Sequence, residues 1–128
     1  MVARALLRVE TFAGNTWVTT AGFNTSLPIS DLGWLKNYSN FVLEGRVEHA
    51  LARTLKRCGY RTVYLTPLPY SFVNEGDFSR SIGFDIVIDQ TALQAASAHQ
   101  TDDFYYDKVL ETIHRLRADG DGPSSFSF

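Results

Sequence analysis

The side chains best suited to chemistry in this sequence include three histidines, and their spacing bears on metal binding. They are His49, His99 and His114, and only His49 lies beside an apolar stripe that predicts a helix. A zinc hydrolase with a His-Glu-x-x-His motif needs two histidines one turn apart on a helix. The segment Glu44–His49 supplies one histidine, so we predict a surface or boundary position for His49.

Cys58 is the only cysteine, so no disulfide can form within the chain. It continues the apolar stripe of the predicted helix, and we therefore expect it to face the core as a small hydrophobic side chain. A nucleophilic thiolate needs an accessible, electropositive setting instead. Pairing of Cys58 with a remote histidine is the alternative.

Several carboxylates lie close together in the sequence. Asp85 and Asp89 share one face of a predicted strand, about 13 Å apart by strand rise, which is too far to share a proton or one metal ion. Glu75 and Asp77 flank Gly76, a pattern typical of a turn. No nucleophilic acid or paired acid–base site is indicated.

A second acidic group opens the last predicted helix. Asp102, Asp103 and Asp107 could join Asp85 or Asp89 in a divalent-cation site, but helix capping explains them adequately. The only Gly-x-Gly pattern follows that helix, where the dipole disfavours phosphate. Gly-x-Ser-x-Gly and phosphate-loop patterns are absent. The sequence therefore predicts no catalytic, cofactor-binding or metal-binding residues.

The bulk composition fits one domain of ordinary size. The chain has 128 residues, a formal net charge of −2 and a pI near 5.8, which argues against binding duplex nucleic acid. Charged residues make up 20% of the chain and aromatic residues 13%. Aromatic enrichment with few charges suits a large core or a buried subunit contact.

The N-terminal residues 1–8 are too broken by charge to form a signal peptide, and no apolar run reaches the roughly 18 residues of a membrane span. We expect a location in the cytoplasm or within a viral particle, with no membrane contact.

The elements that would position these residues divide between strands and helices. We predict an α+β fold: an N-terminal hairpin over 3–23, turning at Gly14, and a second hairpin over 61–89 form a small antiparallel sheet. The sheet packs against two helices over 41–58 and 102–118, whose apolar residues recur with helical spacing. Gly59 is predicted to end the first helix.

Two segments stand outside this scheme. Residues 24–40, rich in Asn, Ser, Gly and Pro, predict a long connection with one helical turn over 30–35. The domain is expected to span 1–120, and 121–128 to form a flexible or partner-binding tail. That tail could add a strand to a sheet edge, in this chain or in a neighbour.

These features favour a non-enzymatic subunit of a larger assembly, a homo-oligomer or a multi-subunit complex. The interface candidates are aromatic: Trp34, Tyr70, Phe72, Phe126 and Phe128. The order helix, hairpin, helix over 41–118, with the segment Arg80-Ser-Ile-Gly-Phe-Asp-Ile-Val-Ile before the last helix, resembles the small tail-completion and head–tail connector proteins of tailed phages. That resemblance implies a compact α+β subunit that assembles as a ring.

Two other functions remain open. One is a small enzyme or ligand-binding domain whose site gathers scattered polar groups, namely Tyr64, Tyr70, Asp85, His99 and Tyr105. The other is an RNA-contacting module that uses the basic face of the helix over 41–58, with stacking on Tyr64 and Tyr70. Its cations are Arg46, Arg53, Lys56, Arg57 and Arg61.

Overall fold

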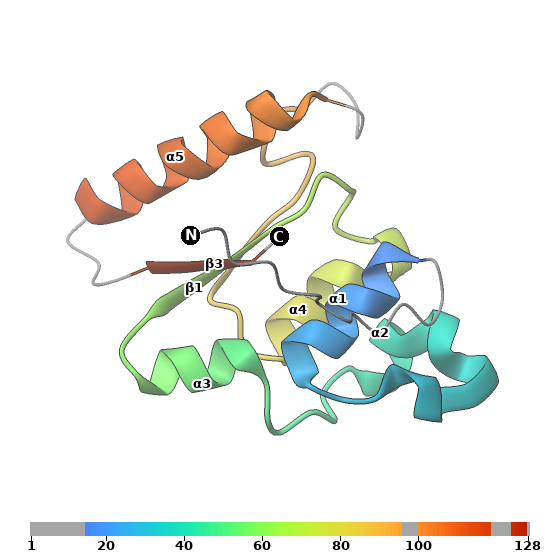
Figure 1. Cartoon of the computed structure of the whole chain (residues 1–128). Helices are drawn as coiled ribbons and strands as arrows, with labels where there is room; N and C mark the ends of the chain where they lie inside the picture. The colour runs from blue at the N-terminus through green and yellow to red at the C-terminus, as the bar shows by residue number, and fades with distance from the viewer. Residues whose placement is uncertain (1–14, 96–99, 119–123, 128) are drawn as a thin grey trace, which may run out of the picture.

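The protein is built around a small parallel sheet with helices on both faces (Figure 1). The computed structural model describes residues 15–95 and 100–118, and the backbone of 124–127. The elements follow in the order α1 (Thr16–Thr25), η1 (Ile29–Tyr38), α2 (Ser39–Leu43), α3 (Leu51–Arg57), β1 (Arg61–Leu65), η2 (Phe72–Asn74), α4 (Glu75–Ser81), β2 (Ile86–Ile88), α5 (Asp102–Ala118) and β3 (Ser124–Ser127).

The sheet has the order β2-β1-β3, and both neighbours run parallel to β1. Val63 is level with Ile86 in β2, and Arg61 with Ser124 in β3. The prediction of an antiparallel sheet is therefore wrong. β1 is buried continuously from Thr62 to Leu65, as expected for a parallel strand covered on both faces.

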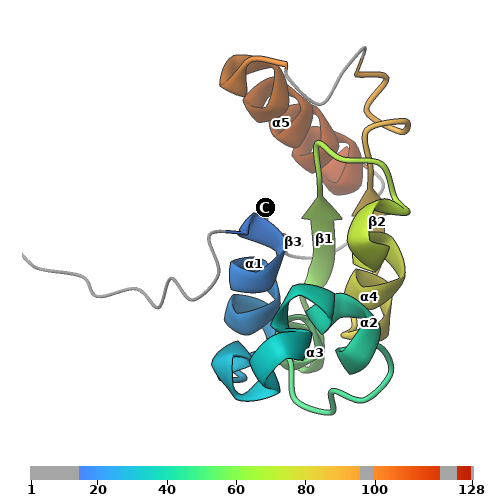
Figure 2. The same cartoon turned by 90° about the vertical axis from the view of Figure 1, so that its right-hand side faces the viewer.

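The two faces of β1 pack into two separate apolar clusters. Tyr64 faces α1, α3 and α4, in a cluster that includes Val18, Ala52 and Phe78. Its neighbours in the strand, Val63 and Leu65, point to the opposite face. There they pack in a second cluster with Ile88 of β2, with Leu93, and with Val109 and Leu116 of α5. Successive strand side chains point to opposite faces. The result is a layer of short helices, a sheet, and α5 alone on the far side (Figure 2).

The segment predicted as the return strand of a hairpin begins inside a helix, α4, and only its later part, Ile86–Ile88, is a strand. Phe78 and Ile82 alternate with polar residues, but they also lie four apart, and both are buried on one face of α4 and its end. Glu75 and Asp77 are in its first turn, and Gly83 follows its end with a φ of 109°. The chain therefore crosses over through η2 and α4 before β2, which makes the pair β1–β2 parallel.

The N-terminal hairpin predicted over 3–23 is also wrong where the structure describes it. Residues 1–14 lie outside the described part, and α1 replaces the second predicted strand. Val18, Ala21 and Thr25 are buried at helical spacing, and the Thr25 hydroxyl donates to the Ala21 carbonyl at 2.7 Å. Burial of this face outweighs the strand preference of the threonine-rich sequence.

The helix predicted over 41–58 is broken in two. α2 ends at Leu43, and Gly45 has a φ of 67°, in the left-handed region. α3 then begins at Leu51 after a non-helical stretch in which Val47 and Ala50 are buried. Gly59, with a φ of 84°, ends α3 as predicted. The segment 24–40, predicted as a connection, contains η1.

α5 occupies the predicted range 102–118 and buries Val109, Thr112 and Leu116. None of the helices in the described residues is both long and apolar enough to span a membrane. The backbone of 124–127 forms β3 on β1, which is one of the two alternatives left open for the tail.

Candidate functional site

The first turn of α1 presents an exposed hydroxyl at a helix N-terminus. Thr16 is the first residue of α1, and its side chain is exposed. The side chain of Asn15 does not cap the helix; its amide nitrogen lies 3.3 Å from Oδ1 of Asn37 instead. The first N–H groups of a helix have no partner within the helix and carry its positive dipole end. This turn is therefore suited to hold an anion beside the Thr16 hydroxyl.

η2 contacts this turn through a pair of aromatic rings. The rings of Trp17 and Phe72 meet edge to face, with centroids 5.7 Å apart. The Trp17 indole N–H also donates to the carbonyl of Asn37 at 3.3 Å. Trp17 thus links the start of α1 both to η1 and to the loop that follows β1.

The backbone of η2 is strained. Val73 has φ 42° and ψ 33°, and Asn74 has φ 60° and ψ 26°. Asn tolerates this left-handed conformation, whereas a β-branched side chain rarely adopts it; such a residue costs about 1–3 kcal/mol. The Asn74 amide donates to Oε2 of Glu44 at 2.8 Å. Strained backbone held in this way is typical of binding and catalytic loops.

Glu75, immediately after η2, has a buried carboxylate. It is 7% exposed and accepts one hydrogen bond from the Tyr64 hydroxyl at 2.5 Å and one from Thr66 Oγ1 at 3.0 Å. Burial raises the pKa of Tyr64 well above its usual value, and the negative charge of Glu75 is the second-largest cause. The phenol therefore remains a proton donor to Glu75. Glu75, predicted to lie in a turn, is instead a buried residue in the first turn of α4.

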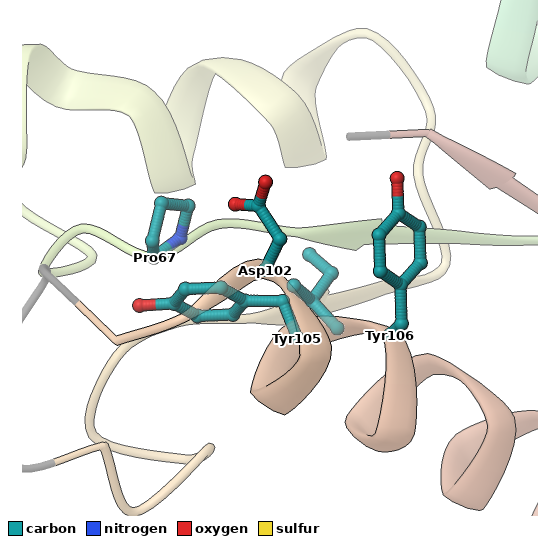
Figure 3. Close-up of a pocket in the computed structure, with 5 residues that line it drawn as sticks. Pro67, Asp102, Tyr105 and Tyr106 are labelled. Atoms are coloured by element: carbon teal, nitrogen blue, oxygen red, sulfur yellow. The ribbon is translucent and has the colours of Figure 1, made fainter.

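A groove lies between the carboxyl end of β1 and the start of α5 (Figure 3). Its volume is about 380 Å³, and it is lined by Leu65, Pro67, Asp102, Tyr105 and Tyr106. The Asp102 carboxylate and the Tyr106 phenol both project into the hollow. Ligands of parallel α/β sheets bind at the carboxyl ends of the strands, and this groove lies at that edge.

The predicted interface residues are dispersed. Trp34 in η1 is 82% exposed. Tyr70 is half-buried and donates its hydroxyl to Asp77 at 2.9 Å, and Phe72 packs against Trp17. The side chain of Phe126 and the whole of Phe128 lie outside the described residues. An interface role for these residues, and the oligomer they would build, remain predictions.

The scattered polar groups considered for an enzyme do not converge. Tyr64 bonds to Glu75 and Tyr70 to Asp77. Asp85 accepts hydrogen bonds from the side chain of Lys56 at 2.5 Å and the backbone of Thr62 at 3.0 Å. Tyr105 lines the groove, and His99 lies outside the described residues. Asp89 accepts from the backbone of Tyr70 at 3.2 Å and Ala92 at 2.9 Å.

The basic cluster is partly engaged in structure. Arg53 donates to the Ser81 carbonyl at 2.6 Å, and Lys56 pairs with Asp85 at 2.5 Å. Arg57 donates to the Arg53 carbonyl at 3.5 Å. These bonds fasten α3 to the end of α4 and to the start of β2, so two of the five cations hold the fold together.

Metal ligands do not gather in the part of the chain that is described. Over 15–95 and 100–118, no three His, Cys, Asp or Glu side chains lie close enough to hold one ion. His49 and His114 are exposed. Cys58 is exposed as well, so the expectation that it faces the core is wrong; it caps the end of α3 instead.

Comparison with known proteins identifies the family. The sequence profile of the sulfatase family matches residues 2–125, and the chain therefore belongs to the sulfatase family. An uncharacterised protein of Haemophilus influenzae is 32% identical over 82 residues. These residues make up 64% of this chain and 15% of that protein.

Among solved structures, the lipoteichoic acid synthase LtaP from Listeria monocytogenes has the same fold, with a TM-score of 0.68. It is 20% identical to this chain, and the match covers 85% of this chain and 26% of LtaP. The chain thus spans a minor part of the length of both proteins.

These matches correct the functional predictions. The resemblance to phage connector proteins is wrong, and so is the prediction of a non-enzymatic structural subunit, because the family is named for an enzyme and its profile covers nearly the whole chain. The alternative of an enzyme whose polar groups are scattered in the sequence is the better one. Thr16 at the start of α1 and Glu75 directly after η2 were not among the predicted site residues.

Proposed function

We propose that this chain forms part of a catalytic domain that acts on esters of a tetrahedral oxyanion, a sulfate ester or a phosphate ester. The supporting observation is the sulfatase profile over 2–125, combined with the uncapped start of α1. A sulfate or phosphate group needs several N–H donors and a positive field, and the first turn of α1 supplies both.

Thr16 is the proposed nucleophile. Its Oγ1 would form a bond to the sulfur or phosphorus atom while the bond to the ester oxygen breaks, and the alcohol would leave with a proton. Water or a second alcohol then takes the group from Thr16 and restores its hydroxyl. A threonine hydroxyl is a weak nucleophile and needs a base or a metal ion to activate it. Among the described residues no side chain forms a hydrogen bond with the Thr16 hydroxyl, so the proposal requires an activating group from elsewhere in the catalytic domain.

The test uses the full-length gene product and the substrates para-nitrophenyl sulfate, para-nitrophenyl phosphate and bis-(para-nitrophenyl) phosphate. Thr16→Ala should lower kcat by about a thousandfold or more, as loss of a nucleophile does, and Thr16→Ser should retain part of the activity. Thr19→Ala is the matched control, because Thr19 is an exposed threonine one turn further along α1. Full activity of Thr16→Ala would rule out this role.

The acceptor distinguishes a hydrolase from a transferase. Both begin with the same step at Thr16, and they differ in whether water or an alcohol removes the bound group. Addition of glycerol to the assay, followed by mass spectrometry of the products, separates the two outcomes.

A further inference from the structure

We infer that Glu75 is a positioning residue, whose buried carboxylate fastens η2 to the carboxyl end of β1 and thereby fixes the loop that faces the first turn of α1. Its effect on catalysis rests on the proposed function. Its effect on the position of the loop does not, and can be measured separately.

The environment of Glu75 requires an explanation. Its carboxylate is 7% exposed and is held by two neutral hydroxyls, from Tyr64 in β1 and from Thr66 just beyond the strand. No Lys or Arg among the described residues pairs with it. Burial of a carboxylate without a cation is costly, so a purely structural role would be met as well by a neutral side chain. The two bonds tie α4 directly to the central strand.

The loop before Glu75 is built as one rigid piece. The N–H of Gly76 donates to the Tyr70 carbonyl at 3.0 Å and closes the segment. A Cβ on Gly76 would lie 2.4 Å from the Tyr70 ring, so the ring packs on the bare backbone. Between them, Val73 and Asn74 turn the chain in the left-handed conformation. The position of Glu75 therefore sets the position of Phe72.

Phe72 connects the loop before Glu75 to the proposed site. Its ring meets Trp17 at 5.7 Å, one residue after Thr16. The contacts run from β1 through Glu75, η2 and Phe72 to the start of α1. Displacement of a reacting group by about 1 Å can cost a hundredfold in rate, so a loop fixed in this way orients the turn that bears Thr16.

The sequence provides an optical probe of this arrangement. Its two tryptophans are Trp17, half-buried against Phe72, and Trp34, which is 82% exposed. In the 128-residue chain with Trp34→Phe, fluorescence reports on Trp17 alone. Glu75→Gln places an amide donor against the hydroxyls of Tyr64 and Thr66. We expect acrylamide quenching of Trp17 to rise about twofold, with the far-ultraviolet circular dichroism unchanged.

Asp77→Asn is the matched control. Asp77 is also an acid in the first turn of α4 and also accepts from a tyrosine hydroxyl, but its side chain is exposed. It should leave Trp17 quenching unchanged. If Glu75→Gln does not fold, Thr66→Val removes one of the two donors, and Thr66→Ser restores it. Quenching that stays at the parent value in Glu75→Gln, or in Thr66→Val where that variant replaces it, would overturn the inference. So would an equal change in Asp77→Asn.

The catalytic arm uses the full-length gene product and the esters named above. Glu75→Gln should lower kcat by about ten- to a hundredfold with KM changed less than about twofold, because orientation and not binding is lost. An unchanged kcat would mean that the loop does not orient the site. Absence of ester cleavage in every variant, the parent included, would instead count against the proposed function and leave the fluorescence result standing.

Discussion

Val73 shows how a single residue can store strain beside a proposed site. Its φ of 42° is unfavourable for a β-branched side chain, yet three neighbouring contacts hold it there: Phe72 against Trp17, the Asn74 amide on Glu44, and the buried Glu75. Such strain persists only where its surroundings fix it. The loop is therefore set by its neighbours and not by its own preference.

Replacement of Val73 by Asn should stabilise the protein. Asn accepts the left-handed conformation, so we expect the free energy of unfolding to rise by about 1 kcal/mol, measured by urea denaturation followed by circular dichroism. Trp17 quenching should not change. The same substitution at Val42, a half-buried residue within α2, should destabilise, because Asn is a poorer residue for a buried helical position. Destabilisation at both positions would contradict the strain at Val73.

The two proposed site residues could not be predicted from their local sequence. Thr16 opens a segment whose threonines and aromatics favour a strand, and only the burial of Val18 and Ala21 against the core makes it a helix. Glu75 beside a glycine is typical of a turn. Its burial depends on Tyr64 and Thr66, which reach it only once β1 and α4 have packed together.

The contact between α3 and the end of α4 depends on a glycine. Gly83 has a φ of 109°, and a Cβ there would lie 2.5 Å from Cγ of Arg53 and 3.3 Å from its backbone nitrogen. Arg53 in turn donates to the Ser81 carbonyl. The two helices can approach this closely only because the side chain is absent.

Gly83→Ala should therefore lower the free energy of unfolding more than Gly45→Ala does. Both glycines have positive φ, but a Cβ on Gly45 would meet nothing within 4 Å. We expect about 1–2 kcal/mol of backbone strain at Gly45 and at least about 1 kcal/mol more at Gly83, since overpacking adds to it. Chemical denaturation of both variants measures the difference. Equal decreases in the free energy of unfolding would show that α3 moves away from residue 83 without further loss of stability.

The elements differ in how far the sequence determines them. α5 was predicted correctly because the spacing of Val109, Ile113 and Leu116 fits only a helix, and Asp102 marks its start. In α4 the spacing of Phe78 and Ile82 fits a strand as well as a helix. The residues at its two ends, the acids of the first turn and Gly83, predict a helix more clearly than this spacing does.

The parallel sheet could not be predicted because the residues of one strand say little about the direction of its partner. The unbroken burial of β1 is the one local signal of a strand covered on both faces. Direction is decided by the crossover through α4, and so the error at α4 became an error in fold class. Two carboxylates, Asp85 before β2 and Asp89 after it, then hold the strand in place.

These carboxylates predict acid sensitivity. Partial burial opposes ionisation of both, but hydrogen bonds from Lys56 and Thr62 to Asp85, and from the backbone of Ala92 and Tyr70 to Asp89, outweigh it, and both pKa values lie below the usual one. A carboxylate whose pKa is lowered in the folded state stabilises the protein at pH values above its pKa in the unfolded chain, which is about 4. That stability should be lost as the pH falls through the folded values.

Urea denaturation across this pH range measures the effect. Asp85→Asn should be less stable than the parent by about 1–3 kcal/mol near neutral pH, and the two should converge as the pH falls below the lowered pKa of Asp85 in the folded protein. A constant difference across the range would show that the charge of Asp85 contributes nothing.

β1 leaves the ribosome before either of the strands that flank it. It pairs with Ile86–Ile88 and with Ser124–Ser127, both made later, so in the nascent chain its apolar run has two open edges at which other chains could add. Arg61 precedes this run and Pro67 follows it. Charged residues and proline beside an apolar strand oppose aggregation. Here they would limit the pairing of β1 with other chains until β2 and β3 have been synthesised.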